Sequence, residues 1–190
     1  MRLFIAILFE EDMIQSLQDV QERLRDAGIE GRFMHEDNLH MTLAFIGDYS
    51  DPDDVLDVMN EIPFKTFCVN TDRIYPFRDM YMMSFAESDD LSTYVRRLRR
   101  ALAQADIPYD RKKFVPHVTL VRKASSKVKD LIIPDIHEPV TVKVRGISLM
   151  RSEFGKNGMI YTEIGYVDGS GYYHVCNSRC EPYHWIPSVF

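Results

Sequence analysis

Residues 38–47 read NLHMTLAFIG, a short apolar segment that carries one histidine and one threonine. Its length and apolar content favour a partly buried β-strand. Residues i and i+2 of a strand lie on the same face, so His40 and Thr42 point to one side. Met41 and Leu43, which are apolar, point to the other side. The segment therefore predicts a strand with a polar pair on one face and core residues on the other.

The same pattern recurs in residues 114–123, which read FVPHVTLVRK. Here His117 and Thr119 stand in the same relation, again between apolar neighbours. A lone histidine in a strand is more often an ordinary core or surface residue. Two copies of His-x-Thr-Leu in one short chain are poorly explained by chance. We therefore interpret the two segments as the two halves of one site.

The rest of the chain predicts three helices and further strands. Apolar residues recur at helical spacing in residues 11–28 and again in residues 89–106. A third helix begins at Pro52, with Asp51 as its N-cap. Strands are expected over residues 2–9, 39–46, 64–75, 80–87, 115–122, 140–150 and 159–165.

The order of these elements predicts the fold class. Residues 1–48 and residues 80–122 are weak copies of one strand–helix–strand unit, and each unit ends in His-x-Thr-Leu. We expect an α+β fold of two lobes related by an approximate two-fold axis, each a mainly antiparallel sheet with helices outside and a cleft between them. This domain is expected to span residues 1–165. An aromatic tail over residues 166–190, which contains cysteines, is expected to pack on it.

The composition limits the class of protein. The chain has 190 residues, of which 45% are hydrophobic, enough for a sizeable core. Its net charge of −6 argues against a protein that grips a long nucleic-acid backbone, so any nucleic-acid substrate is short or is held at an end. Three cysteines favour a reducing compartment. No segment approaches the roughly 20 apolar residues of a membrane span, so we expect a cytoplasmic protein with no membrane association and infer no obligate protein partner.

Two imidazoles and two hydroxyls in one cleft suit attack on a phosphodiester without a metal. Histidine can both take and give a proton near neutral pH, so one imidazole can activate the nucleophile while the other protonates the leaving oxygen. The threonine hydroxyls can donate to the non-bridging oxygens as the phosphorus becomes five-coordinate. This chemistry needs no cofactor.

Metal binding is a weaker interpretation. The two histidines lack the i, i+4 helical spacing of a zinc protease site, and His35, Glu36 and Asp37 precede the first motif but not the second. The tail has the spacing H-x-C-x₃-C-x₃-H, which fits no familiar zinc site. The residues of this weak alternative are His174, Cys176, Cys180 and His184.

Together, these residues resemble the two-histidine (2H) phosphoesterase superfamily, and more closely its bacterial branch of 2′-5′ RNA ligases, or RNA 2′,3′-cyclic phosphodiesterases. The likeness covers residues 1–165 and rests on RLFIAI, NLHMTLAFIG, FVPHVTLVRK and ISLMRSEFGKNGMIYTEIG. It implies a bilobed fold and the opening of a 2′,3′-cyclic phosphate, on RNA ends or small nucleotides, to a 2′-phosphomonoester. It also implies ligation to a 5′-hydroxyl end, which is the same chemistry with a hydroxyl in place of water.

The resemblance also implies roles for individual residues. The family's paired histidines map onto His40 and His117, and its threonines onto Thr42 and Thr119. Its basic residue after the second motif maps onto Arg122, a candidate for holding a phosphate. A 2′-phosphate product requires the acid to protonate O3′, and we expect His40 to be that acid and His117 the base.

Aromatic and basic residues outside the motifs are candidates for contacts with RNA. Phe45, Tyr81 and Phe33 are possible base-stacking rings, although each also suits a core position. An arginine run on the third helix is interpreted as a solvated face, with guidance of RNA as the alternative. That run consists of Arg96, Arg97, Arg99 and Arg100.

Two further functions remain open from the residues. One is a phosphodiesterase for 2′-5′ oligonucleotides or another cyclic phosphate, which would share the site and differ in its substrate pocket. The other is a nucleotide- or RNA-end-binding module without catalysis. Two intact His-x-Thr pairs favour an enzyme, because binding alone does not need two acid–base groups.

Overall fold

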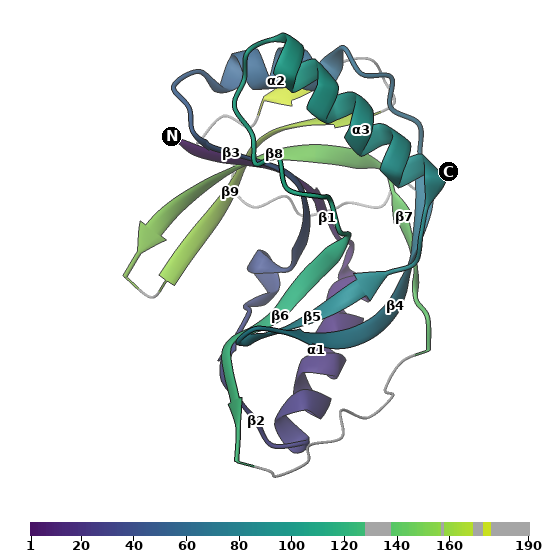
Figure 1. Cartoon of the computed structure of the whole chain (residues 1–190), viewed down its shortest axis with the longest axis vertical. Helices are drawn as coiled ribbons and strands as arrows, with labels where there is room; N and C mark the ends of the chain where they lie inside the picture. Colours follow the sequence, from purple (N-terminus) through teal and green to yellow (C-terminus); the bar gives the residue numbers. More distant parts are fainter. Residues whose placement is uncertain (128–137, 157, 169–172, 176–190) are drawn as a thin grey trace, which may run out of the picture.

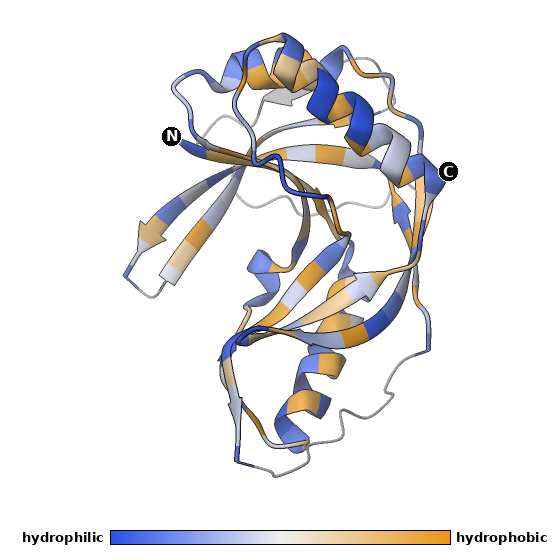
Figure 2. Ribbon diagram, viewed as in Figure 1, coloured by the Kyte–Doolittle hydropathy of each residue, from blue (hydrophilic) through white to orange (hydrophobic). Residues whose placement is uncertain are grey.

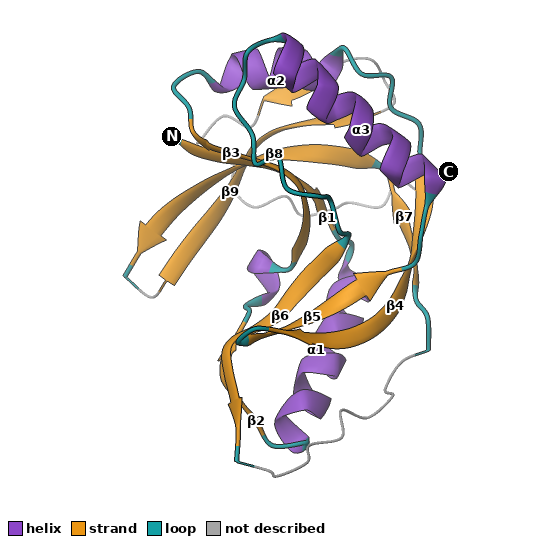
Figure 3. Ribbon diagram, viewed as in Figure 1, coloured by secondary structure: helices purple, strands orange, loops and turns teal. Residues whose placement is uncertain are grey.

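In this computed structural model the helices that begin at Pro52 and Asp89 start at a side-chain cap, whereas Glu10, before the first helix, makes no side-chain cap hydrogen bond. Asp51 accepts a hydrogen bond from the N–H of Asp53 and Pro52 is the first helical residue, as predicted. Ser88 caps the third helix by accepting from the N–H of Leu91. No helix among the described residues is long and apolar enough to cross a bilayer. The helices are α1 (Glu11–Asp26), α2 (Pro52–Asn60), α3 (Asp89–Gln104) and a short 3₁₀ turn, η1 (Glu36–Asn38) (Figure 3).

The strands join into one curved sheet, and every pairing within its described part is antiparallel (Figure 1). The structure describes residues 1–127, 138–156, 158–168 and 173–175. Residues 173–175 are described by their backbone only. The strands are β1 (Arg2–Leu8), β2 (Ile29–Phe33), β3 (His40–Asp48), β4 (Phe67–Phe77), β5 (Met80–Phe85), β6 (His117–Ser126), β7 (Thr141–Val144), β8 (Gly146–Gly155), β9 (Gly158–Asp168) and β10 (Tyr173–Val175).

Two features of the predicted strands need correction. Residues 140–150 form two strands instead of one, because β7 pairs with β4 whereas β8 pairs with β1. β2 was not predicted, since its sequence IEGRF is mostly exposed and has no apolar alternation. The expected domain boundary at residue 165 falls inside β9, and β10 pairs with β9, so the backbone of the expected tail begins within the sheet.

The sheet divides into two halves that meet where β3 lies beside β6 (Figure 1). The first half-sheet has the order β10-β9-β8-β1-β3, and the second has β6-β5-β4-β7 with β2 on the free part of β6. In the described register Met41 pairs with Val118 at this junction. The two lobes of the predicted α+β fold are therefore these half-sheets and their helices.

Each long helix contacts a strand of the other repeated unit. α1 follows β1 in the chain but contacts β2 and β6 of the second half-sheet. α2 contacts β9 and β10 of the first half-sheet, and α3 contacts β3 of the first and β4 of the second. Figure 1 shows α2 and α3 above the first half-sheet and α1 against the second. The strand–helix–strand units found in the sequence are thus not self-contained lobes, because α1 packs on the second half-sheet and α3 contacts both.

Both motifs are followed by the same break in register. In β3, Leu43 has no partner in β1, because the flanking residues pair with consecutive residues of β1. In β6, Leu120 likewise has no partner in β5, because the residues on either side of it pair with consecutive residues of β5. Each is a β-bulge, which inserts one residue into a strand and reverses the side to which the following residues point. The two half-sheets therefore carry a bulge at the same position relative to the motif, at Leu43 and at Leu120.

The core lies between the sheet and its helices. Leu3 and Ile5 of β1 are fully buried in it. Phe4 and Ala6 alternate with them and form a second, smaller cluster with Met150 on the opposite face of the sheet. The alternation of apolar and polar residues along the strands is visible in Figure 2.

Candidate active site

A small cavity of about 80 Å³ lies at the junction of the two half-sheets, because strands β3 and β6 both line it. It contains all five residues that the sequence singled out for catalysis and phosphate binding. The lining residues are Met34, Asn38, His40, Thr42, His117, Thr119 and Arg122.

The register of β3 and β6 explains why both motifs reach this cavity. Met41 pairs with Val118, and both side chains are fully buried. Consecutive residues of a strand point to opposite faces, so the histidine and threonine on either side of each point to the cavity. In an antiparallel pair this register also places each histidine opposite the threonine of the other motif.

The bulge after the second motif brings Arg122 to the same cavity. In a regular strand a residue five positions after His117 would point to the opposite face. The extra residue at Leu120 reverses that relation, so Arg122 shares the face of His117 and Thr119 and lines the cavity. The equivalent bulge in β3 turns Phe45 toward the cluster of Phe4.

Each imidazole is held by the backbone two residues earlier. Nδ1 of His40 lies 2.9 Å from the carbonyl oxygen of Asn38, and Nδ1 of His117 lies 2.7 Å from that of Val115. A carbonyl oxygen can only accept a hydrogen bond, so Nδ1 carries a proton in both rings. Nε2 is therefore the nitrogen left to exchange a proton in each. The two histidines are prepared in the same tautomer.

Burial distinguishes His40 electrostatically. The pKa of His40 is lowered from 6.5 to about 4, mainly by desolvation and to a smaller extent by the charge of Arg122 and that of protonated His117, against the opposing effect of the bond to the Asn38 carbonyl. With this pKa His40 is neutral at pH 7, which is the form of a general base and does not favour the acid role expected from the sequence.

Two aromatic rings that the sequence analysis did not single out cause part of this burial. The ring centroid of Phe4 lies 4.9 Å from that of His40, and the ring of Tyr161 lies edge-on at 5.1 Å. Strand alternation provides a signal for Phe4, because it lies on the same face as Ala6, which pairs with Thr42. Tyr161 comes from β9 and had no such signal, because only the tertiary fold brings β9 near His40.

The three predicted stacking residues lie in different places. Phe33 lines a second, larger cavity, with the guanidinium of Arg25 3.9 Å from its ring centroid. Phe45 and Tyr81 line neither of these two cavities. Phe45 lies beneath the guanidinium of Arg2, and Tyr81 packs against the main core.

The larger cavity, of about 1160 Å³, adjoins the small one. The two share Met34 and Asn38 as lining residues. Residues of α1, β2, η1 and the β8–β9 hairpin line it, among them Tyr161. The side-chain amide of Asn38 donates to the carbonyl of Met159 at 3.3 Å, which ties η1 to the hairpin. A ligand held in the small cavity therefore has an open space beside it.

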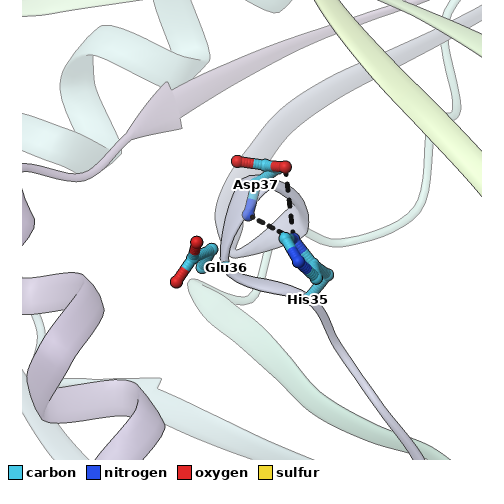
Figure 4. A group of neighbouring side chains, drawn as sticks. All are labelled: His35, Glu36 and Asp37. Carbon is cyan, nitrogen blue, oxygen red and sulfur yellow. Dashed lines mark hydrogen bonds and ion pairs between the residues drawn. The ribbon is translucent and has the colours of Figure 1, made fainter.

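One group of possible metal ligands stands apart from the small cavity. Ligand atoms of His35, Glu36 and Asp37 lie within 4.8 Å of one another, and Nδ1 of His35 is 3.2 Å from a carboxylate oxygen of Asp37 (Figure 4). All three residues are exposed, and none of them lines the small cavity. The residues of the alternative zinc site have side chains outside the described part of the structure. They are His174, Cys176, Cys180 and His184.

Comparison with known proteins identifies relatives along most of the chain. The family model described as the 2′-5′ RNA ligase superfamily matches residues 9–156. A curated RNA 2′,3′-cyclic phosphodiesterase of Thermotoga maritima is 24% identical over 177 residues, which cover 85% of this chain and 91% of the relative. The protein of the same name from Aquifex aeolicus is 29% identical over 170 residues, covering 79% and 89%.

Solved structures share the fold. Escherichia coli LigT complexed with 3′-AMP superposes with a TM-score of 0.74 at 23% identity, covering 89% of this chain and 98% of LigT. A Thermus thermophilus protein superposes with a TM-score of 0.73 at 24% identity, covering 88% and 97%. The predicted α+β, two-lobed architecture is confirmed by these superpositions.

Proposed function

This chain belongs to the 2′-5′ RNA ligase superfamily, and we propose that it opens 2′,3′-cyclic phosphates on RNA ends or small nucleotides to 2′-phosphomonoesters. The observation that carries this proposal is the convergence of both His-x-Thr pairs and Arg122 on one small cavity. The curated relatives named RNA 2′,3′-cyclic phosphodiesterase, which match most of the chain, support the same reaction.

The reaction needs two proton transfers, and the two imidazoles supply both. A water molecule attacks the phosphorus while His117 accepts its proton at Nε2. The bond from phosphorus to O3′ breaks, its electron pair stays on O3′, and His40 donates the proton that O3′ needs. The phosphate remains on O2′. Each proton-transfer partner typically contributes about 10²–10⁴-fold in rate, so no metal is required in this scheme.

The remaining residues of the cavity stabilise the phosphate. Thr42 and Thr119 donate hydrogen bonds to its non-bridging oxygens, and the guanidinium of Arg122 balances their negative charge. The phosphodiester anion also raises the pKa of nearby histidines, which opposes the effect of burial on His40. His40 therefore takes up its proton together with the substrate and then acts as the acid.

The sizes of the cavities indicate how a substrate is held. The small cavity, about 80 Å³, accepts a phosphate group but not a nucleoside, since cavities for drug-sized ligands measure about 300–1,000 Å³. The nucleoside extends into the adjoining larger cavity, where Phe33 and Tyr161 offer rings for stacking. The same site ligates RNA when a 5′-hydroxyl replaces the attacking water.

The direct test is hydrolysis of 2′,3′-cyclic AMP, and of a short RNA ending in a 2′,3′-cyclic phosphate, in excess EDTA. We expect turnover to 2′-AMP by the wild type, and a decrease in kcat of at least about a hundredfold in His40→Ala and in His117→Ala. Arg100→Ala is the control, because this exposed residue of α3 lines neither cavity.

Three results would overturn the proposal. These are loss of wild-type turnover in EDTA, activity indifferent to both cavity histidines, or 3′-AMP as the product. Tight binding of the nucleotide without turnover would instead favour a binding module. Faster cleavage of a 2′-5′ linked dimer than of the cyclic phosphate would favour a 2′-5′ phosphodiesterase.

A further inference from the structure

Gln21 and Arg99 hold equivalent positions in the two repeated units. Each is the eleventh residue of a 16-residue helix, Gln21 in α1 and Arg99 in α3. Gln21 is 3% exposed, although glutamine is rarely so buried. Arg99 belongs to the arginine run interpreted as a solvated face, but it is half-buried whereas its neighbours Arg97 and Arg100 are exposed. That interpretation is therefore wrong for Arg99.

The amide of Gln21 joins the two motifs. Its Nε2 donates to the carbonyl oxygen of Leu120 at 2.9 Å and to that of Met34 at 2.9 Å. Leu120 is the bulge residue that follows the second motif. Met34 lies in the segment that leads into the first motif and itself donates its N–H to Leu120. Gln21 thus ties the end of one motif to the approach of the other.

Arg99 makes the equivalent connection in the other direction, from the second unit to the first. Its Nε and Nη2 donate to the carbonyl oxygen of Leu43 at 3.2 and 3.0 Å, and its Nη1 donates to that of Lys112 at 2.7 Å. Leu43 is the bulge residue that follows the first motif, and Lys112 lies in the segment that leads into the second. The guanidinium also lies over the rings of Tyr109 and Phe114 in that segment.

These contacts explain how the bulges are maintained. A bulge removes one residue from the hydrogen-bonded ladder, and a buried carbonyl without a partner is unfavourable. The carbonyl of Leu43 accepts from Arg99. The carbonyl of Leu120 accepts from Gln21 as well as from the N–H of Met34. Both side chains belong to a helix of the other unit. The bulge after the second motif also turns Arg122 toward the cavity, so the same contact supports its orientation.

We propose that Gln21 and Arg99 are positioning residues that set the separation of the two His-x-Thr pairs across the junction of the half-sheets. In the described register β3 and β6 share the pair Met41–Val118, so the junction itself offers little to fix their angle. The hydrogen bonds of Gln21 and Arg99 connect the two motifs on both sides of the junction. The inference rests on the proposed function, because it assigns the separation to acid–base catalysis.

The test replaces Gln21 and Arg99 by residues of similar size that cannot make the same hydrogen bonds. Gln21→Met and Arg99→Met remove the donors, and Arg99→Gln places in one unit the amide found in the other. Gln15→Met and Arg100→Met are matched controls, because both residues are exposed on the same two helices. For each variant kcat and KM for 2′,3′-cyclic AMP, the melting temperature, and the NMR signals of the two histidine rings are measured.

We expect each methionine variant to lower kcat about tenfold to a hundredfold, because a displacement of about 1 Å in a catalytic group has effects of this size. KM should change less than about threefold, the ring signals of His40 and His117 should shift, and Arg99→Gln should recover part of kcat. The controls should match the wild type.

Two outcomes would overturn the inference. One is that Gln21→Met and Arg99→Met both fold, keep kcat within about twofold of the wild type and leave the histidine ring signals unchanged. The other is a lower melting temperature with normal kcat, which marks a purely structural role. Absence of turnover in the wild type would contradict the proposed function instead, and the ring signals would still decide whether Gln21 and Arg99 position the histidines.

Discussion

Met41 pairs with Val118 where the two half-sheets meet, and each stands between the histidine and the threonine of its motif. The pair therefore lies on the approximate two-fold axis of the molecule. One histidine and one threonine come from each lobe, so neither lobe has a complete site. Any change in the angle between the lobes alters the distance between the two imidazoles.

The pH dependence tests the acid role of His40. Burial holds the pKa of His40 at about 4 in the free protein, and an acid must be protonated. In His117→Ala, where protonation of the base does not contribute to the profile, the residual kcat/KM should therefore fall as the pH rises from about 4 to about 7. The bound anion raises that pKa, so kcat should persist to higher pH and KM should rise with pH. Steady-state kinetics with 2′,3′-cyclic AMP measure both profiles. If kcat/KM instead rises above pH 4 to a plateau, His40 is the base.

The threonine hydroxyls should contribute to the rate more than to stability. Thr42→Val and Thr119→Val keep the shape of the side chain but remove the donor to the phosphate, and each should lower kcat at least about tenfold. Their melting temperatures should stay near that of the wild type, because both residues are only half-buried. Thr66→Val, at an exposed loop position, is the control. Rates equal to the wild type in both variants would remove the hydroxyls from the mechanism.

Arg122 should act mainly in binding the phosphate. Arg122→Met should raise KM about tenfold and weaken inhibition by inorganic phosphate, because a charged two-pronged donor is lost. Arg122→Lys should recover only part of the affinity, since an ammonium cannot bind two oxygens in parallel. Lys123→Met, the adjacent exposed residue, is the control. Unchanged phosphate inhibition in Arg122→Met would show that the guanidinium does not contact the anion.

The ring of Tyr161 should account for part of the low pKa of His40. Burial disfavours the charged imidazole, so Tyr161→Ala should raise this pKa from about 4 toward 6.5 by admitting water. An NMR titration of the ring protons measures it, with His40→Ala to assign the signal. Tyr75→Ala, in β4 and outside both cavities, is the control. A pKa that does not move would assign the desolvation to Phe4 and the backbone instead.

Much of the secondary structure was predictable because it depends on local patterns. The helices follow from apolar spacing and from caps such as Asp51, and the strands β1, β3 and β6 follow from apolar segments. The division of residues 140–150 into β7 and β8 was not predictable. It reflects pairing with β4 and with β1, which are distant in the sequence, and no local signal at Arg145 records that choice.

The sequence by itself determined that His40 and Thr42 share a face, as do His117 and Thr119, because the two-residue period of a strand is a local property. Only the tertiary structure decided that these faces meet at Met41 and Val118. It also decided that bulges turn Arg122 into the cavity and that Phe4 and Tyr161 bury His40. Register, bulges and burial depend on partners far away in the chain, and periodicity along one segment carries no information about them.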